Sequence, residues 1–107
     1  MEANKVIDSI KQVATDVLPK GSSVYLYGSR ARGDYHEDSD WDLLVLIDKP
    51  QRDPYDWENY AWPFIQKGWA LNEDISARTF TKDMWYNGPH TMFYFNVEED
   101  KIILYES

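Results

Sequence analysis

The chain has 107 residues, no cysteine and a net charge of −8. This length predicts a single domain, residues 1–107, and the absence of cysteine excludes disulfides, thiolate catalysis and cysteine-bound zinc. The acidic charge argues against direct nucleic-acid binding, and the lack of a signal peptide or of an apolar segment near ~18 residues predicts a cytoplasmic protein that does not bind a membrane.

The first predicted element is an amphipathic helix over residues 3–18. Its apolar side chains recur at helical spacing, at Val6, Ile10, Val13 and Val17. Pro19 and Gly21 end this helix, and a short strand rich in Val and Tyr follows over residues 23–27. Gly28 breaks the strand, and a helical turn is expected to begin near Arg30.

The middle of the chain predicts a second strand and a second long helix. Residues 41–47 are apolar apart from Asp42, which is typical of a strand covered on both faces. Asp53 and Pro54 predict a helix start, and this helix is expected to reach Lys67. We expect Pro63 to kink or interrupt the helix and Gly68 to end it.

The last third of the chain predicts one clear strand and an ambiguous tail. Residues 70–81 alternate, so that one face carries Ile75, Ala77 and Thr79 and the other carries Asp74, Ser76 and Arg78. A helical turn over 82–86 precedes the breaker Asn87-Gly88-Pro89. The tail predicts either β structure or a short helix followed by a strand over 101–105. The expected class is therefore α/β or α+β, a small mixed β-sheet flanked by helices.

Two carboxylates stand at the start of the second predicted strand. Asp40 and Asp42 are two residues apart, so a rise of ~3.3 Å per residue separates their Cα atoms by roughly 6.6 Å and points both side chains the same way. Such a pair can bind magnesium, including two ions about 3.5–4 Å apart, together with the phosphates of a substrate. Asp74, on the polar face of the next strand, is the best candidate for a third ligand.

An anion-binding segment is predicted just before this carboxylate pair. Gly28 and Ser29 lie where a strand gives way to a helical turn, and the first N–H groups of a helix can bind phosphate. Arg30 and Arg32 add the densest positive charge of the chain. Two interpretations of these arginines stay open: they bind the phosphates of a nucleoside triphosphate, or they are surface residues paired with nearby acids.

The segments GSRARG (28–33) and SDWDLLVL (39–46) resemble the signature of the nucleotidyltransferase superfamily related to DNA polymerase beta. They are most similar to the minimal nucleotidyltransferases, one-domain proteins that share the form Gly-Ser-x-Ala-Arg-Gly. The resemblance covers residues 5–107 and implies the nucleotidyltransferase fold. It also implies that Asp40 and Asp42 bind catalytic magnesium and that Asp74 is the third carboxylate.

The resemblance further implies a reaction and a partner. AMP would pass from ATP to a hydroxyl group, with Asp40, Asp42 and Asp74 as the catalytic and metal-binding residues and two magnesium ions as cofactors. The phosphates would be bound by Gly28, Ser29, Arg30 and Arg32. Many minimal nucleotidyltransferases are antitoxins that modify HEPN-domain ribonuclease toxins, so we expect such a toxin as the protein partner, and the acidic surface would suit a basic one.

Two alternatives to protein modification stay open. The chain ends at residue 107 and leaves no room for a second substrate-binding domain, so we expect the acceptor site to lie on another molecule. One alternative is a catalytically weak, nucleotide-binding antitoxin that acts by steric binding. The other is a stand-alone nucleotidyltransferase with a small-molecule acceptor, acting alone or as an oligomer.

Overall fold

In the computed structural model, which describes residues 3–107, four strands form one mixed sheet. The strands are β1 (Ser23–Tyr27), β2 (Trp41–Ile47), β3 (Ile75–Thr81) and β4 (Ile102–Glu106), and their order across the sheet is β3-β2-β1-β4. β1 runs antiparallel to both of its neighbours, whereas β2 and β3 are parallel. A parallel pair needs a long crossover connection, which the helices between β2 and β3 supply.

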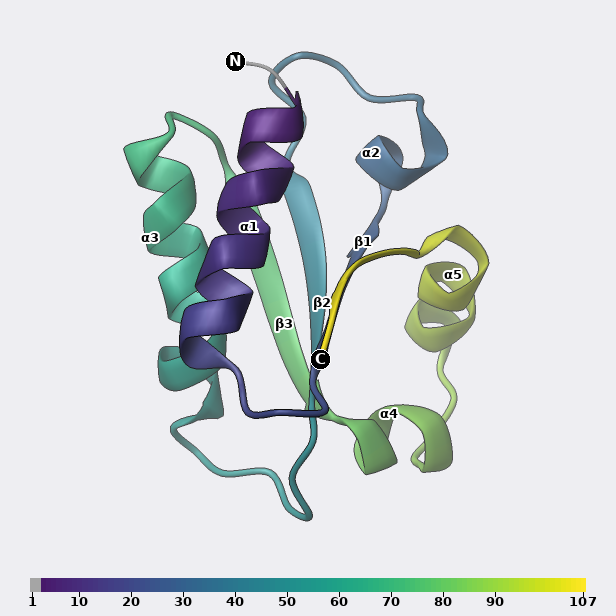
Figure 1. Cartoon of the computed structure of the whole chain (residues 1–107). Helices are drawn as coiled ribbons and strands as arrows, with labels where there is room; N and C mark the ends of the chain where they lie inside the picture. Colours follow the sequence, from purple (N-terminus) through teal and green to yellow (C-terminus); the bar gives the residue numbers. More distant parts are fainter. Residues whose placement is uncertain (1–2) are drawn as a thin grey trace.

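Helices cover both faces of the sheet (Figure 1). The first face is covered by α1 (Ala3–Val17), a π-helical turn η1 (Trp57–Ala61) and α3 (Trp62–Ala70). The second face is covered by α4 (Lys82–Asn87) and α5 (Met92–Asp100), and the short α2 (Ser29–Arg32) follows directly after β1. This arrangement confirms the predicted class, a small mixed sheet flanked by helices.

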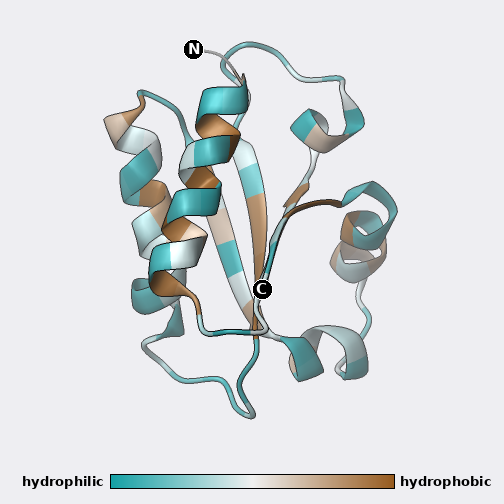
Figure 2. Cartoon of the chain, viewed as in Figure 1, coloured by the Kyte–Doolittle hydropathy of each residue, from teal (hydrophilic) through white to brown (hydrophobic). Residues whose placement is uncertain are grey.

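Strand β2 divides its side chains between the two faces. Leu43, Val45 and Ile47 are fully buried in the first-face core, which also contains the buried side chains of α1 and Phe64 of α3. Leu44 and Leu46 are fully buried in the second-face core, together with Trp85 of α4 and Val97 of α5. Figure 2 shows β2 as hydrophobic over most of its length and α1 banded in polar and apolar residues. The prediction of a strand covered on both faces is confirmed.

The helix predicted after Asp53 begins later and ends later than expected. Asp53 accepts a hydrogen bond from the Tyr55 amide at 2.8 Å in a turn, but the first helical residues come only after this turn. The expected interruption at Pro63 is present as the π-helical turn before α3, whose first turn contains the proline. Gly68 does not end the helix: α3 continues to Ala70, and the glycine is buried against Ile75.

The third strand is shorter than predicted, because residues 70–74 form the end of α3 and a turn rather than β structure. Asn72 has a left-handed backbone conformation with φ 58°, and the Glu73 amide donates to the Gly68 carbonyl at 2.8 Å. A Cβ on Gly68 would lie 2.8 Å from Ile75 Cγ1. Glycine is therefore needed at this position because β3 packs closely against the end of α3.

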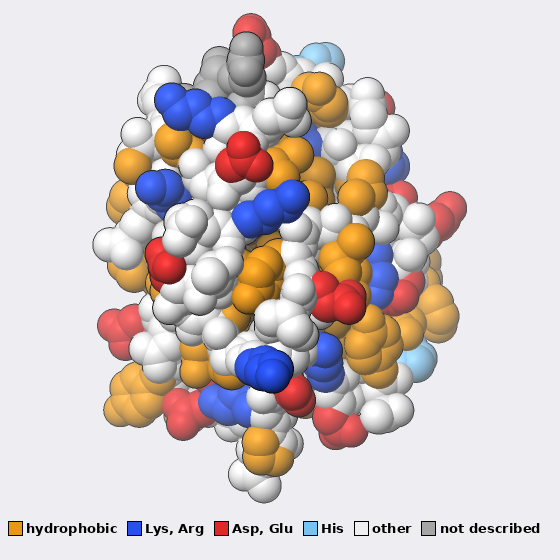
Figure 3. Space-filling model, in the orientation of Figure 1, with side chains coloured by type: hydrophobic (Ala, Val, Ile, Leu, Met, Phe, Trp, Pro, Cys, Tyr) orange, Lys and Arg blue, Asp and Glu red, His pale blue; other side chains and the backbone are white. Residues whose placement is uncertain are grey.

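The ambiguous tail forms a helix followed by a strand. Thr91 caps α5 by accepting a hydrogen bond from the Tyr94 amide at 3.3 Å, and β4 then pairs with β1 at the edge of the sheet. Hydrophobic side chains gather over α5, at the right of Figure 3, whereas charges of both signs are interspersed over the rest of this view. Among residues 3–107, no helix combines the length and the apolar character that crossing a membrane would require.

Candidate active site

The predicted phosphate-binding turn lies against one of the predicted metal ligands. β1 ends at Tyr27, α2 begins at Ser29, and Gly28 joins them with a φ of 77°. Tyr27 is the register partner of Asp42 in the neighbouring strand. A Cβ built on Gly28 would overlap the carboxylate oxygen Oδ2 of Asp42. Glycine at this position therefore allows both the left-handed turn and the close approach of the backbone to the Asp42 carboxylate.

Asp40 and Asp42 form an interacting carboxylate pair at the start of β2. Asp42 is the second residue of the strand and is half-buried, whereas Asp40 precedes the strand and is exposed. Burial raises the pKa of Asp42, and repulsion from the Asp40 carboxylate raises it further. Arg78 and Arg32 oppose this rise in the pKa of Asp42 but do not cancel it. The pair thus forms a site that is short of positive charge.

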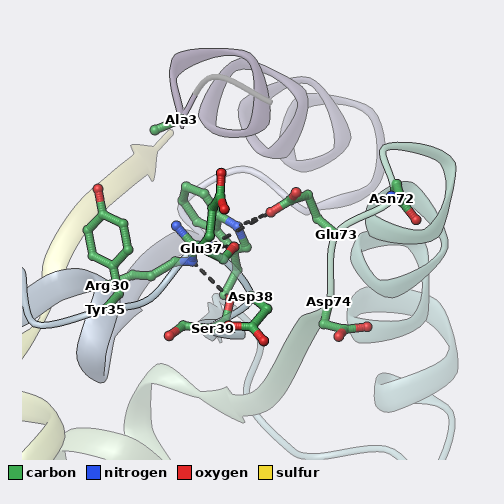
Figure 4. Close-up of a pocket in the computed structure, with 10 residues that line it drawn as sticks. Ala3, Arg30, Tyr35, Glu37, Asp38, Ser39, Asn72, Glu73 and Asp74 are labelled. Carbon is green, nitrogen blue, oxygen red and sulfur yellow. Dashed lines mark hydrogen bonds and ion pairs between the residues drawn. The ribbon is translucent and has the colours of Figure 1, made fainter.

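Asp74, the predicted third ligand, directly precedes β3, and its backbone is hydrogen-bonded to the start of β2, the strand that carries Asp42. Its carbonyl accepts a hydrogen bond from the Trp41 amide at 2.8 Å, and the strand register pairs Trp41 with Ile75. Its side chain is exposed, and in Figure 4 the Asp74 carboxylate extends away from Arg30. Within residues 3–107, no three His, Cys, Asp or Glu side chains are spaced to hold a metal together. The structure brings Asp40 and Asp42 together and leaves the Asp74 side chain outside the pair.

Arg30 is bound to the loop between α2 and β2. Its Nε and one terminal nitrogen each donate at 3.0 Å to a backbone carbonyl, those of Ser39 and Glu37. Its guanidinium lies over the rings of Tyr35 and Trp41, and only 8% of the side chain is exposed. Because these contacts use its donors and its surface, Arg30 shapes the loop that presents Asp40, and its predicted contact with phosphate stays a prediction.

A pocket of about 500 Å³ lies beside Arg30 (Figure 4). Glu37, Asp38, Glu73 and Asp74 line it together with Asn72 and Ser39. Glu73 points into this pocket toward Arg30, and it accepts a hydrogen bond from the indole nitrogen of Trp41 at 2.9 Å. The pocket is therefore acidic at its rim and is closed at one side by a buried arginine.

Arg32 is exposed and pairs with two carboxylates. Its guanidinium donates to Asp100 of α5 at 2.9 Å and to Asp34 at 3.3 Å, and these hydrogen bonds raise the pKa of Arg32. Of the two interpretations, the pairing with nearby acids is therefore the arrangement that Arg32 has in this structure. The interpretation as phosphate ligands requires Arg32 to exchange its carboxylate partners for a more highly charged anion.

Two further side chains near the pair were not assigned from the sequence. Arg78 of β3 lies on the same side of the sheet as Asp42, with its guanidinium 4.8 Å from the centre of the Phe93 ring. Tyr27 is the register partner of Asp42; burial raises its pKa, Asp42 raises it further, and Arg78 opposes the rise. The alternation of Asp74, Ser76 and Arg78 was the available signal for Arg78, whereas the register that places Tyr27 beside Asp42 has no local sequence signal.

These residues fit magnesium rather than a softer metal. Asp40 and Asp42 supply hard carboxylate oxygens, and the chain has no cysteine. Burial first, and then repulsion from the Asp40 carboxylate, raise the pKa of Asp42, and a divalent cation bound to the pair would favour its ionised form. The close approach of Gly28 to the Asp42 carboxylate leaves no room for a side chain at position 28.

The sequence of residues 3–104 matches the nucleotidyltransferase domain family. The chain belongs to this family. A matching segment of 48 residues is 44% identical to an inferred protein adenylyltransferase from Methanocaldococcus jannaschii. That match spans 44% of this chain and 48% of the archaeal protein, so it covers about half of the relative's length.

Solved structures share the fold of this nucleotidyltransferase. A toxin–antitoxin crystal structure with AMP-PNP superposes with a TM-score of 0.66 and 24% identity, over 94% of this chain and 73% of the other. A complex of a tri-AMPylated HEPN toxin with its MNT antitoxin from Shewanella oneidensis superposes with a TM-score of 0.62 and 20% identity, over 97% of this chain and 72% of the other. At these identities the likeness establishes the fold, which is the one that the resemblance in the sequence implied.

Proposed function

We propose that this nucleotidyltransferase transfers AMP from ATP to a hydroxyl group on a protein partner, with magnesium as cofactor. The observation that carries the proposal is the Asp40–Asp42 pair against the Gly28–Ser29 turn. A carboxylate pair beside a strand-to-helix turn places metal ligands and phosphate donors within one small site. The 44% identity to an inferred protein adenylyltransferase supports the choice of AMP and of a protein acceptor.

Each predicted residue has a role in this proposal. Asp40 and Asp42 would hold magnesium, which when bound would neutralise the triphosphate and lower the pKa of the acceptor hydroxyl. The Ser29 hydroxyl and the amides of the turn at Gly28 would hold the β- and γ-phosphates. Arg32 would leave Asp34 and Asp100 to stabilise charge on the departing pyrophosphate, while Arg30 fixes the loop. Asp74, after a rotation of its side chain, would accept the proton of the hydroxyl at a carboxylate oxygen.

The proposed partner is a HEPN-domain toxin. Two structures with this fold are toxin–antitoxin complexes, one with AMP-PNP and one whose HEPN toxin is tri-AMPylated. The net charge of −8 suits a partner that is basic enough to bind RNA. Modification of the toxin would then be the means of neutralising it.

Co-expression with the partner tests this proposal. We expect the intact mass of the partner to increase by AMP-sized steps with the wild-type protein, and to show no increase with Asp42→Asn or after removal of divalent metal. Asp38→Asn is the matched control, since Asp38 is an exposed carboxylate outside the pair. AMP transfer by Asp42→Asn at the wild-type rate would contradict the proposal.

A nucleotide-binding antitoxin that acts by steric binding is the second candidate. The observation in its favour is the Asp74 side chain, which does not join the carboxylate pair among the described residues. Partner inhibition that survives the double variant Asp40→Ala, Asp42→Ala with no transfer of label would support it. Label from ATP appearing on a small molecule instead would support a stand-alone enzyme.

A further inference from the structure

A hollow of about 350 Å³ lies at the outer edge of β3. β3 is the last strand of the sheet on this side and pairs only with β2. Its lining includes Arg52, Trp57, Ser76, Arg78, Thr79 and Phe80. Unlike the pocket beside Arg30, it has no acidic residue in its lining. It is therefore a basic and aromatic site in an acidic protein.

The two arginines of the hollow are available to a ligand. Both are exposed, and within residues 3–107 neither forms an ion pair with a carboxylate. Their guanidinium groups lie over aromatic rings, Arg52 at 5.9 Å from the centre of Phe80 and Arg78 at 4.8 Å from that of Phe93. This differs from Arg30 and Arg32, whose donors are already bound to carbonyls or carboxylates. These cation–π contacts position the two guanidinium groups and leave their charge without a carboxylate partner among the described residues.

A second, independent observation also points to a ligand. Thr79 lines the hollow and is only 4% exposed, yet its Oγ1 has no hydrogen-bond partner among the described residues. A buried hydroxyl without a partner is uncommon, because a hydroxyl that has lost its water needs another hydrogen-bond partner. Trp57 also lines the hollow and is 49% exposed. Within the described part of the chain, the hollow thus combines two arginines that lack a carboxylate partner, an exposed aromatic ring and, beneath its surface, a buried hydroxyl without a partner.

The position of the hollow relates it to the proposed reaction. Ser76, which lines it, is the register partner of Asp42, and neighbouring strands are about 4.8 Å apart. The Gly28–Ser29 turn lies on the opposite side of Asp42, after β1. In phosphoryl-type transfers the attacking and leaving oxygens are roughly in line. With pyrophosphate leaving on the β1 side, the acceptor hydroxyl must arrive from the β3 side.

We propose that this hollow binds an acidic side chain, Asp or Glu, of the polypeptide segment that carries the acceptor hydroxyl. The segment lies along the free edge of β3 as an added strand, where main-chain hydrogen bonds set its position and Arg52 with Arg78 select its carboxylate. This inference rests on the proposed function, because it names the acceptor of the same site. The inference adds that the acceptor segment carries an acidic residue at this point, even though this protein has a net charge of −8 and the proposed partner is basic.

Peptide binding without ATP or metal tests the site separately from catalysis. The probes are three blocked peptides of equal length, each with a central tyrosine flanked by glutamate, glutamine or lysine, titrated into the full chain by calorimetry. We expect the glutamate peptide to bind most tightly, and its affinity to fall with added salt. Arg52→Gln should weaken that binding about tenfold, the loss expected for one charge-assisted hydrogen bond. Lys5→Gln, an exposed cation of α1, is the matched control and should change nothing.

Several outcomes would overturn the inference. They are equal binding of the glutamate and glutamine peptides, no binding of any peptide, or unchanged affinity in Arg52→Gln with an unaltered circular dichroism spectrum. ATP that competes with the glutamate peptide in the absence of metal would assign the hollow to nucleotide and would equally contradict it. If the glutamate peptide binds as expected while no AMP transfer occurs, the proposed function fails and the anion site stands.

In the transfer assay, the same substitution should act on one substrate only. We expect Arg52→Gln to raise the KM for the partner protein and to leave the KM for ATP and kcat unchanged. An equal rise in the KM for ATP would contradict the assignment.

Discussion

The two faces of the sheet use alternate residues of one strand and differ in what holds them together. On the first face, Leu43, Val45 and Ile47 of β2 pack against the aliphatic side chains of α1 and against Phe64 of α3. On the second face, Leu44 and Leu46 pack against aromatic side chains, and polar contacts complete the attachment of α4 and α5. Asp42 lies half-buried near the start of β2, and its side chain is on the second face together with those of Leu44 and Leu46.

This difference shows where stability and chemistry are placed. The second face contains a chain of polar contacts in which Glu98 accepts from the indole of Trp85 at 2.7 Å and from Lys101 at 2.6 Å. The same face carries Asp42 and the unpaired Arg78. A face whose contacts are all apolar would tolerate neither the Asp42 carboxylate nor the Arg78 guanidinium, because buried charges without partners are costly. The functional groups therefore lie on the face where partners and solvent are within reach.

The largest effect is expected from the first face. Phe64 is fully buried in that core, so Phe64→Ala should lower the free energy of unfolding by about 3–5 kcal/mol. Phe95→Ala is the control, because this α5 side chain is 55% exposed and its loss should cost under about 1 kcal/mol. Urea denaturation followed by circular dichroism measures both. Equal losses in the two variants would contradict the claim that the buried core of the first face, and not exposed aromatic surface, stabilises the fold.

A smaller loss, joined to a loss of binding, is expected at Gly28. Gly28→Ala forces a side chain into a left-handed backbone conformation and against Asp42, which should cost about 1–3 kcal/mol and weaken ATP binding in magnesium. Gly33→Ala is the matched control, since Gly33 has a φ of 88° and its Cβ would meet nothing within 4 Å. It should share only the backbone cost. Similar ATP affinities in the two variants would argue against the proposed role of the Gly28 turn.

The polar attachment of the second face should be sensitive to pH. Burial lowers the pKa of Lys101, but hydrogen bonds with Glu98 and Tyr86 outweigh this and raise it above its usual value. A raised pKa means that the contact stabilises the fold at neutral pH and that this contribution is lost as pH rises through the pKa of Lys101. Glu98→Gln should lower the free energy of unfolding by about 1–2 kcal/mol near pH 8. The difference in the free energy of unfolding between Glu98→Gln and the wild type should disappear above about pH 10.4, the usual pKa of lysine. A difference that stays constant with pH would contradict the stabilising contact between Lys101 and Glu98.

The smallest effect is expected at Asp42. Its raised pKa means that ionisation weakens the fold as pH rises through that pKa, so Asp42→Asn should raise Tm at pH 7.5 while abolishing transfer. The gain in Tm should vanish as pH falls below about 3.9, the usual pKa of aspartate, since position 42 is then uncharged in both proteins. Thermal unfolding at several pH values measures this. A lower Tm for Asp42→Asn at pH 7.5 would contradict the claim that burial and the neighbouring Asp40 make the ionised Asp42 carboxylate unfavourable.

Local patterns in the sequence predicted the elements whose signals are local. The apolar segment at 41–47 and the break at Gly28 depend on neighbouring residues only, and the structure contains both of them. Gly68 was assigned to a helix end because glycine usually marks one. Its actual partner is Ile75, seven residues further on, and this tight contact cannot be read before the fold is known.

The roles of the arginines depended on contacts that the sequence does not display. Arg30 binds the carbonyls of Glu37 and Ser39 in its own loop, and Arg32 reaches Asp100 of α5 across the molecule. Arg78 became a candidate because β3 is an edge strand and because no described carboxylate pairs with it. In the sequence, Arg30 and Arg32 stand out by their motif and their charge. The structure shows that their guanidinium groups already bind carbonyls or carboxylates, whereas those of Arg52 and Arg78 have no carboxylate partner among the described residues.

The intact mass of a co-expressed partner, measured with wild type and with Asp42→Asn, tests the central claim most directly. The account predicts AMP-sized increments on the partner that require magnesium and disappear in Asp42→Asn, while the variant stays folded and still binds the partner. A partner that is unmodified by a folded, ATP-binding wild-type protein, or one that is modified equally by both proteins, would contradict it.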